Sequence, residues 1–289
     1  MISQTALLCA LARAVHTHSK TEKLFEDKFA IDFITLKDYR NARNLAKNIF
    51  PAKRAGLKES YPAKDLLNQY FLPIILPRNR FAEDIVEAKQ KEGKVQYVLL
   101  GAGLDSFALR NKSKNVEVFE LDLHETQTFK IARVKKLITN NHPNVHFVEI
   151  DFNKDSVTDK LVHSGFDPNT PSVFSILGVS YYIPIEIFFK TVSQISQIAS
   201  PGSGLVFDYY EKESSTNNYS KIVRLKQIAA DCGEQMAEGY DSKQVAELVK
   251  KSGFKSCLDL APKDINKSFF KAHSELTAFE NVHLVYGEK

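Results

Sequence analysis

The sequence predicts an α/β fold with a mostly parallel, Rossmann-like sheet, and three observations support this. From Gly93 onward, short apolar segments of strand length alternate with amphipathic segments of helix length. The strand segments are almost continuously apolar, as in strands that are buried on both faces of a parallel sheet. The first of them runs directly into a Gly-x-Gly turn, which is typical of a ligand-binding loop at the carboxyl end of a strand.

Residues 1–92 are predicted to form an N-terminal helical extension, or cap, over a sheet domain of residues 93–289. Apolar residues recur at helical spacing after Ser3, which is a suitable N-cap, so the first helix is expected to begin there. A second helix with one apolar face is expected within residues 21–34, and an amphipathic helix within residues 78–91. Pro51, Gly56 and Pro62 indicate a loop-rich segment between them.

The sheet domain is expected to contain seven strands. The first five are expected at residues 95–100, 116–121, 145–150, 171–177 and 204–210. Helices are expected between most of these strands, at residues 125–138, 156–162 and 185–198. The polar segment 211–221 is expected to be an exposed excursion. A helix capped by Asp241 and two final strands, within residues 252–260 and 281–289, complete the predicted order.

The composition is that of an ordinary globular protein and argues against several classes. Hydrophobic residues make up 43% of the 289 residues, and the formal net charge of +4 is spread along the chain rather than gathered in a basic stripe. No apolar segment approaches the roughly 20 residues that a membrane span needs. The N-terminal segment lacks a basic start, and Arg13 interrupts its apolar run, so it does not fit a signal peptide. We therefore expect a cytoplasmic protein with neither a nucleic-acid nor a membrane partner.

The cysteine and histidine positions predict neither a disulfide framework nor a metal centre. The three cysteines are odd in number, widely spaced and without a Cys-x-x-Cys pair, so free thiols are expected. The close histidine pairs are His16-x-His18 and His142-x-x-x-His146, and Pro143 rules out a helical metal-binding face for the second pair.

The segment VLLGAGLDS carries the strongest local signal for chemistry. Gly101 and Gly103 follow a predicted strand, where glycines allow the backbone to approach a ligand closely. The third glycine of the dinucleotide pattern would fall at position 106, which is Ser106. The turn therefore indicates an adenosine-containing ligand without specifying a dinucleotide. Arg110, at the end of the helix that follows, is assigned a structural role at the negative end of the helix dipole.

Two further groups of side chains follow the next two strands. Glu120 and Asp122 lie roughly 20 residues beyond the glycines, where a carboxylate can accept both hydroxyls of a ribose. Asp151 could accept hydrogen bonds from the exocyclic amine of an adenine, and Phe152 could pack on its ring. Because ligands bind outside the carboxyl ends of the strands in open α/β sheets, these positions favour a shared site.

An ordered set of segments between residue 3 and about residue 210 resembles the leucine carboxyl methyltransferase family and its bacterial branch. In order, the resembling segments are SQTALLCALARAVHT, LFEDKFA, PRNRFAEDIVEA, VLLGAGLDSFALR, VFELD, VEIDF, GFDPNTPSVFSILGVSYYIP and SPGSGLVFDY. The resemblance implies a class I methyltransferase fold and S-adenosylmethionine as the cofactor.

The resemblance also implies roles for named residues. Arg78 matches an arginine that meets the carboxylate of the cofactor, as a guanidinium fork can. Gly101 lies at the glycine turn, Asp122 matches the ribose carboxylate, and Asp151 with Phe152 matches the adenine-side pair. Either Glu120 or Asp122 could face the ribose, and the family pattern favours Asp122.

One departure from the family pattern bears on the acceptor. Many members carry a glutamate just before the glycine that Gly178 matches, whereas this chain has Leu177. This argues against transferring the protein-phosphatase substrate of the eukaryotic members to this chain. Tyr181 and Tyr182 follow, and they are assigned either to the acceptor side of the site or to its apolar wall.

The resemblance implies O-methylation of a carboxylate or a hydroxyl on a small molecule or a protein terminus. Two alternatives remain at this point. A nicotinamide-dependent oxidoreductase would explain the Gly-x-Gly turn and the acid after the second strand, but it would not explain Ser106 or the ordered family segments. The second alternative is a protein that binds the cofactor without catalysis, because Leu177 replaces an acid.

Overall fold

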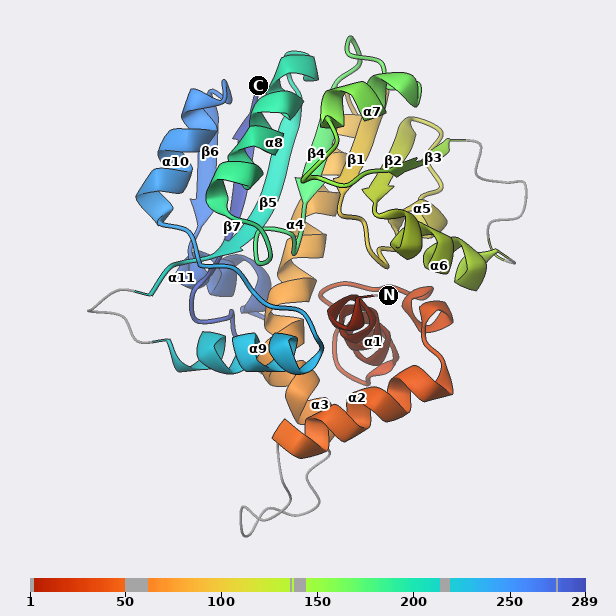
Figure 1. Ribbon diagram of the computed structural model, residues 1–289, viewed down its shortest axis with the longest axis vertical. Coiled ribbons are helices and arrows are strands. Elements are labelled where there is room, and N and C mark those ends of the chain that lie inside the picture. The colour runs from red at the N-terminus through yellow and green to blue at the C-terminus, as the bar shows by residue number, and fades with distance from the viewer. Residues whose placement is uncertain (1–2, 50–61, 136, 138–143, 214–218, 274) are drawn as a thin grey trace.

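The computed structural model describes residues 3–49, 62–135, 137, 144–213, 219–273 and 275–289, and its centre is a seven-stranded sheet. The strands are β1 (Val95–Leu100), β2 (Val116–Asp122), β3 (Val145–Glu149), β4 (Ser172–Ile176), β5 (Gly204–Tyr210), β6 (Ser256–Leu260) and β7 (Val282–Glu288). Their order across the sheet is β3-β2-β1-β4-β5-β7-β6 (Figure 1). All strand pairings are parallel except those of β7, which runs antiparallel to both β5 and β6. The predicted α/β class and mostly parallel, seven-stranded sheet are therefore confirmed.

The helices alternate with the first five strands and then cluster around the sheet. They are α1 (Gln4–His18), η1 (Ala30–Phe33), α2 (Leu36–Ile49), α3 (Pro62–Leu66), η2 (Leu67–Phe71), α4 (Leu72–Gln90), α5 (Phe107–Arg110), α6 (His124–Val134), α7 (Val157–His163), α8 (Ile185–Ile198), α9 (Ser220–Asp231), α10 (Ser242–Lys251), α11 (Pro262–Ile265) and η3 (Asn266–Phe270). Within the described part of the chain, none of them combines the length and apolar character that crossing a bilayer would require.

Both predicted N-caps have the expected geometry. The Ser3 hydroxyl accepts the Ala6 N–H at 3.0 Å, and the Asp241 carboxylate accepts the Gln244 N–H at 2.9 Å. A short polar side chain at the N-cap satisfies one of the backbone N–H groups that the first helical turn leaves without a partner. These two residues therefore fix where α1 and α10 begin.

Helices cover both faces of the sheet, and each face has its own apolar core. Helices α7, α8 and α10 pack on one face, where Phe119 and Phe174 of the sheet meet Phe188 of α8. Helices α4 and α5 pack on the other face, where Val86 and Phe107 meet alternate side chains of β1 and β2. Burial on both faces explains the nearly continuous apolar strands of the sequence.

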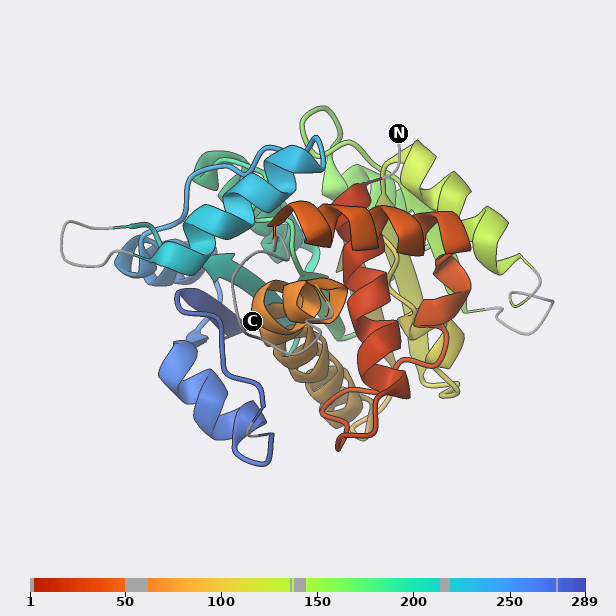
Figure 2. The ribbon, with the colours of Figure 1, turned by 90° about the horizontal axis from the view of Figure 1, so that it is seen from below.

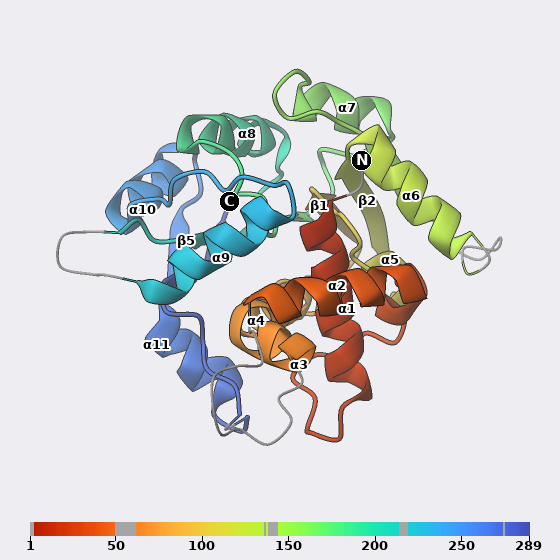
Figure 3. The same ribbon diagram turned by 60° about the horizontal axis from the view of Figure 1, so that its bottom comes forward.

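A layer of helices covers the carboxyl edge of the sheet. Helices α1, α2 and α9 lie across this edge when the molecule is viewed from below (Figures 2 and 3). One apolar cluster joins side chains of α1, α2, α4 and α9 to others near the C-terminus, such as Phe279 and Leu284. The N-terminal segment thus forms the expected helical cap. The domain boundary between residues 92 and 93 stays a prediction, since α4 packs against both the cap and the sheet.

The predicted helix within residues 21–34 is wrong, because only the short 3-10 helix η1 forms there. The Asp27 carboxylate accepts the N–H groups of Phe29 at 3.2 Å and Ala30 at 3.0 Å. Such local bonds from a side chain to the backbone compete with the hydrogen bonds of an α-helix. The apolar residues that suggested a helix face are buried instead by a compact loop and one 3-10 turn.

Other element boundaries differ from the prediction in smaller ways. The helix expected at residues 78–91 begins earlier, at Leu72, with Pro73 in its first turn and Pro77 within it. Helix α9 begins inside the predicted exposed excursion, of which residues 214–218 lie outside the described part of the chain. The predicted helix 125–138 ends at Val134, and residues 136 and 138 are also outside the described part.

A buried ion pair ties α1 to the loop that follows β1. Arg13 is 4% exposed, and its Nε donates to the fully buried carboxylate of Asp27 at 2.8 Å. The same guanidinium donates to the backbone carbonyl of Leu104, within the glycine turn, at 2.5 Å. Arg110 lies 3.7 Å from the Asp27 carboxylate and makes a two-pronged contact with Glu83 of α4, which fits its predicted structural role.

Replacing Arg13 by methionine should destabilise the fold strongly, because Asp27 would lose its closest cation inside the protein. We expect a loss of about 3 kcal/mol or more in the free energy of unfolding, measured by urea denaturation. Lys28→Ala is the matched control, since Lys28 forms an exposed pair with Glu26 at 3.7 Å. The control should change stability by less than about 1 kcal/mol. Equal effects of the two variants would contradict a structural role for the buried pair.

The same pair should make stability depend on pH in acid. Burial raises the pKa of Asp27, but Arg13 and Arg110 lower it by more, so the pKa in the folded protein lies below the ordinary value of 3.8. A carboxyl with a depressed pKa stabilises the fold above its unfolded-state pKa and loses that contribution as the pH falls through the folded-state value. The stability difference between wild type and Arg13→Met, followed by denaturation from pH 7 downward, should therefore shrink below pH 3.8.

Candidate functional site

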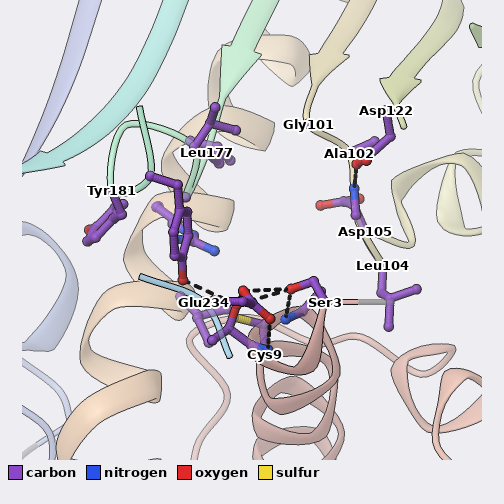
Figure 4. A pocket seen from close by; sticks show the side chains of 18 of the residues that line it. Ser3, Cys9, Gly101, Ala102, Leu104, Asp105, Asp122, Leu177, Tyr181 and Glu234 are labelled. Atoms are coloured by element: carbon purple, nitrogen blue, oxygen red, sulfur yellow. Dashed lines mark hydrogen bonds between the residues drawn. The ribbon is translucent and has the colours of Figure 1, made fainter. Parts of the chain in front are cut away.

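A cavity of about 360 Å³ lies where the carboxyl ends of β1, β2 and β4 meet the helical cap. Gly101, Ala102 and Asp122 lie on one side of it, and Leu177 and Tyr181 lie on the opposite side (Figure 4). Arg78 and Tyr182 also line it. The first turns of α1 close it from below. The cavity therefore occupies the position at which open α/β sheets bind their ligands.

The glycine turn after β1 depends on the absence of side chains. Gly101 and Gly103 have positive φ angles of 73° and 50°, a conformation that other residues adopt at a cost. A Cβ on Gly101 would lie 2.4 Å from Cγ2 of Val179. The N–H groups of Gly101 and Ala102 both donate to the Leu121 carbonyl, at 2.8 and 3.0 Å. The turn thus curls back over the end of β2 and presents bare backbone to the cavity.

Asp122 closes the turn from the neighbouring strand. Its carboxylate accepts the Gly103 N–H at 2.6 Å and the Leu123 N–H at 2.7 Å, one on each oxygen. Burial raises the pKa of Asp122, and these two hydrogen bonds act against that shift. Because a carboxylate has about four acceptor positions, each oxygen can still accept a ligand hydroxyl.

Arg78 reaches the cavity from the middle of α4. One of its terminal nitrogens, Nη1, donates to the Asp208 carboxylate at 3.0 Å, and its Nε is buried without a hydrogen-bond partner in the described part of the chain. Burial lowers the pKa of the guanidinium, but the charge of Asp208 outweighs this and the net shift is upward. The structure therefore places a permanently charged fork with free donors at the cavity wall.

The N-terminus of α1 is fastened to the loop after α9 at the bottom of the cavity. The Glu234 carboxylate accepts the Thr5 hydroxyl at 2.5 Å, the Thr5 N–H at 3.1 Å and the Ser3 hydroxyl at 3.0 Å. An anion at this end of a helix is favoured by the free N–H groups and the helix dipole. The Tyr182 hydroxyl joins the group by donating to the Thr5 hydroxyl at 3.2 Å. These hydrogen bonds tie α1, the loop after α9 and the turn after β4 together at the cavity.

Most of the predicted site residues line this one cavity. These are Arg78, Gly101, Gly103, Asp122, Phe152, Tyr181 and Tyr182. The two tyrosines differ in direction. Tyr182 points down to Thr5, whereas the ring of Tyr181 packs against that of Tyr210 with centroids 5.6 Å apart. Leu177, at the position where the family pattern has an acid, lines the cavity with an apolar side chain.

The structure does not bring Glu120 into the cavity, which corrects that prediction. Its side chain is 1% exposed and its carboxylate pairs with the Lys130 ammonium of α6 at 2.5 Å. Burial raises the pKa of Glu120 and Lys130 opposes this shift. Because successive strand residues point to opposite faces, Glu120 and Asp122 point to the same face of β2. Asp122 reaches the cavity because it is the last residue of the strand. Glu120, two residues earlier, is covered by α6.

Asp151 also lies outside the cavity lining, although its neighbours Ile150 and Phe152 belong to it. Its carboxylate accepts the Asn153 N–H at 3.0 Å and contacts the Lys154 ammonium at 2.8 Å. This is the local turn that an aspartate favours after a strand. An adenine contact by Asp151 therefore stays a prediction, while Phe152 is in place.

Three residues at the site had no place in the sequence prediction. Asp208 binds Arg78 but appears in the sequence only as an acid within the apolar strand GLVFDYY. Glu234 lies in a loop with no motif. Asn79 follows Arg78 and donates to the Asp105 carboxylate in the glycine loop at 3.4 Å. Of these three residues, only Asp208 had a signal in the sequence that could have pointed to the site, because it is an acid near the carboxyl end of a buried strand.

Among the residues that the structure describes, no three His, Cys, Asp or Glu side chains are grouped so that they could hold a metal ion. Of the charged groups that line the cavity, Arg13 and Arg78 have carboxylate partners, whereas Asp122 and Glu234 accept N–H and hydroxyl groups. The site therefore offers hydrogen-bond donors, carboxylates and an apolar surface to a ligand.

The sequence profile of the leucine carboxyl methyltransferase family matches residues 6–196. YktD of Bacillus subtilis, named as a candidate S-adenosyl-L-methionine-dependent methyltransferase, is 33% identical over 99% of this chain and 98% of its own length. A Mycobacteroides abscessus protein of the same description is 29% identical over 71% of this chain and 66% of its own length.

Solved structures share the fold at low sequence identity. A protein from Streptomyces avermitilis, described as a member of the DUF574 family, aligns over 100% of this chain and 98% of its own, with a TM-score of 0.61 and 12% identity. A candidate methyltransferase from Thermobifida fusca aligns over 97% of this chain and 94% of its own, with a TM-score of 0.57 and 12% identity. At this level of identity the two structures support the fold alone.

Replacing Gly101 by alanine should destabilise the protein by more than strained backbone alone would. The added Cβ would meet Val179 at 2.4 Å in addition to requiring a φ of +73°. Gly202→Ala is the matched control, because Gly202 has a φ of +82° but nothing within 4 Å of an added Cβ. The control should cost about 1–2 kcal/mol, and Gly101→Ala about 1–3 kcal/mol more, in urea denaturation. A second substitution, Val179→Ala, should recover part of the difference, and no recovery would contradict the steric explanation.

Proposed function

The chain belongs to the leucine carboxyl methyltransferase family, and from this membership we propose that it transfers a methyl group from S-adenosylmethionine to an oxygen atom of its acceptor. Membership makes the chain an S-adenosylmethionine-dependent methyltransferase. The observation that supports this cavity as the place of methyl transfer is the glycine turn, which Asp122 holds in position. Gly101 and Gly103, held by Asp122, lie in the same cavity as the free donors of Arg78.

The residues present fit S-adenosylmethionine by their chemistry. The bare backbone of the glycine turn would allow the adenosine part to approach the sheet closely. Asp122 keeps acceptor positions on both oxygens for a pair of ribose hydroxyls. Phe152 and Ile150 offer an apolar surface for a base. At the other end of the cavity, the guanidinium of Arg78 is partly exposed and suits a carboxylate.

When bound, the sulfonium of the cofactor supplies a methyl group that is already activated for attack by a nucleophile. The protein therefore has to orient two molecules and exclude water. The cluster of Glu234, Thr5 and Tyr182 lies at one side of the cavity, and apolar side chains of α1 and α9 line the region beside it. An ionised carboxylate acceptor would need no general base, and a hydroxyl acceptor would have to pass on its proton.

Apolar side chains dominate the part of the cavity that lies away from the glycine turn. They come from α1, η2, α4, α9 and the loop after α9, and they are Cys9, Tyr70, Phe71, Ile74, Ile75, Leu225, Ile228, Ala229 and Met236. Both guanidinium groups at the cavity already have carboxylate partners, Asp27 for Arg13 and Asp208 for Arg78. This lining supports a small acceptor with an apolar body over an extended protein terminus, with a hydroxyl or carboxylate as the methylated group.

A nicotinamide-dependent oxidoreductase is not favoured. The family match covers residues 6–196, and Ser106, in place of the third glycine of the dinucleotide pattern, is buried and accepts a hydrogen bond from Arg110 at 2.8 Å. A relative that binds the cofactor without catalysis is a separate outcome, and a transfer assay distinguishes it.

Binding of S-adenosylhomocysteine tests the cofactor site directly. Wild type should bind it saturably in calorimetry. Asp122→Ala should weaken binding by about tenfold or more, since hydrogen bonds to a charged group contribute about 1.5–3 kcal/mol each. Glu149→Ala, an exposed acid on the neighbouring strand β3, is the matched control and should bind as wild type does. Unchanged binding in Asp122→Ala would contradict the assigned site.

The chemical nature of the acceptor group can be read from the stability of the transferred label. Protein incubated with methyl-labelled S-adenosylmethionine and fractions of a bacterial small-molecule extract should label an organic-soluble product. Mild alkali releases volatile methanol from a methyl ester but not from a methyl ether, so the treatment separates a carboxylate from a hydroxyl acceptor. Label on nitrogen or sulfur would contradict oxygen methylation. Cofactor binding without transfer to any fraction would indicate an inactive relative.

A further inference from the structure

We propose that Asp208 is a positioning residue that holds the Arg78 guanidinium ready for the zwitterionic amino-acid end of the cofactor. The inference rests on the proposed cofactor site and extends it to a residue that does not itself line the cavity. Arg78 does line the cavity, so Asp208 would act through Arg78.

Asp208 is held tightly. Its side chain is 0% exposed, Oδ1 accepts the Gly178 N–H at 2.7 Å, and Oδ2 accepts Nη1 of Arg78 at 3.0 Å. Its own carbonyl accepts the Ser180 hydroxyl at 2.6 Å. The carboxylate is therefore fixed by the backbone of the turn after β4, and through its hydrogen bond it fixes the position of the guanidinium.

The sheet register explains why this acid lies beside that turn. In the parallel pair β4 and β5, Ile176 pairs with Phe207, so Leu177, the first residue after β4, lies beside Asp208 of β5. Asp208 itself stays in the sheet, where it pairs with Leu284 of β7. Leu177 contributes an apolar side chain to the cavity, and the carboxylate beside it comes from β5 instead. A negative charge is thus present at this end of the sheet, but it lies on β5 and not at the position of Leu177 after β4.

Gly178 makes room for the guanidinium. A Cβ at this position would lie 2.8 Å from Nη1 and 2.9 Å from Nη2 of Arg78, and the residue has a φ of +73°. The planar fork can therefore lie against the backbone of the turn. With Asp208 on Nη1 and the turn against both terminal nitrogens, the guanidinium has little freedom to rotate.

The charge balance indicates which kind of ligand the pair can accept. Arg78 and Asp208 together are neutral, and the Arg78 side chain is only 12% exposed. A ligand with a lone carboxylate would leave one uncompensated negative charge in this buried region, which is costly. The amino-acid end of S-adenosylmethionine or S-adenosylhomocysteine carries a carboxylate and an ammonium, so the total charge stays balanced. The exposed part of the Arg78 guanidinium, which lines the cavity, offers that carboxylate a charge-assisted hydrogen bond.

Two ligands that differ only in this end of the molecule test the role. S-Adenosylhomocysteine carries the amino-acid group, whereas 5′-methylthioadenosine retains the adenosine and the sulfur without it. Calorimetry on wild type should show tighter binding of S-adenosylhomocysteine. In Asp208→Asn this preference should fall by about tenfold or more, while binding of 5′-methylthioadenosine stays within about twofold of wild type. Asp259→Asn is the matched control, because Asp259 on β6 binds Tyr209 and His283 away from the cavity, and it should keep the preference.

A second variant guards against loss of folding, because Asp208→Asn leaves the Arg78 charge unpaired. Asp208→Glu keeps the negative charge but moves it by one methylene, so it should reduce the preference while thermal unfolding shows a folded protein. Equal weakening of both ligands, or an unchanged preference in the folded variants, would overturn the positioning role. Failure of wild type to bind either ligand would instead overturn the proposed function.

Discussion

The buried pair of Arg13 and Asp27 is the interaction on which the arrangement of cap and sheet depends. Arg13 also attaches the first helix of the chain to the Leu104 carbonyl, inside the glycine loop that forms one side of the cavity. A buried charge pair contributes little net stability but tolerates few alternative arrangements, since either partner alone would be costly. The cap therefore helps to support the glycine turn after β1. The position of the cap over the sheet edge is fixed by electrostatics as well as by apolar packing.

The core of the fold could be predicted from local sequence, and its connections could not. Apolar runs located β1 and β5 to the residue, and polar side chains located the starts of α1 and α10, because these signals act over a few neighbouring residues. The loop around Asp27 failed as a prediction because its conformation depends on Arg13, which is 14 residues away. The end of the predicted excursion is helical for a similar reason: α9 is held by apolar contacts with α1 and α4.

At the site, the sequence identified residues that line the cavity better than the residues that hold them. Motif spacing indicated the glycine turn and Asp122, the family resemblance indicated Arg78, and all of them line one cavity. Spacing alone could not choose between Glu120 and Asp122, because they lie on the same side of β2 and the choice depends on where the strand ends and how far α6 covers that side. It could not find Glu234, whose role comes from an N-terminal helix more than 200 residues earlier in the chain. Contacts between distant segments leave no local pattern in the sequence. Several of the charged side chains at this site are held by such contacts.

The position of β7 has a consequence for how the protein is made. The last strand of the chain lies between β5 and β6 and pairs with all seven residues of β5. Until residues 282–288 have left the ribosome, the edge of β5 has no partner on that side and β6 has nothing to join. Exposed strand edges of this kind favour association with other chains. The sheet can therefore be completed only after residues 282–288 have been made, and removal of these residues would leave β6 without its partner and one edge of β5 unpaired.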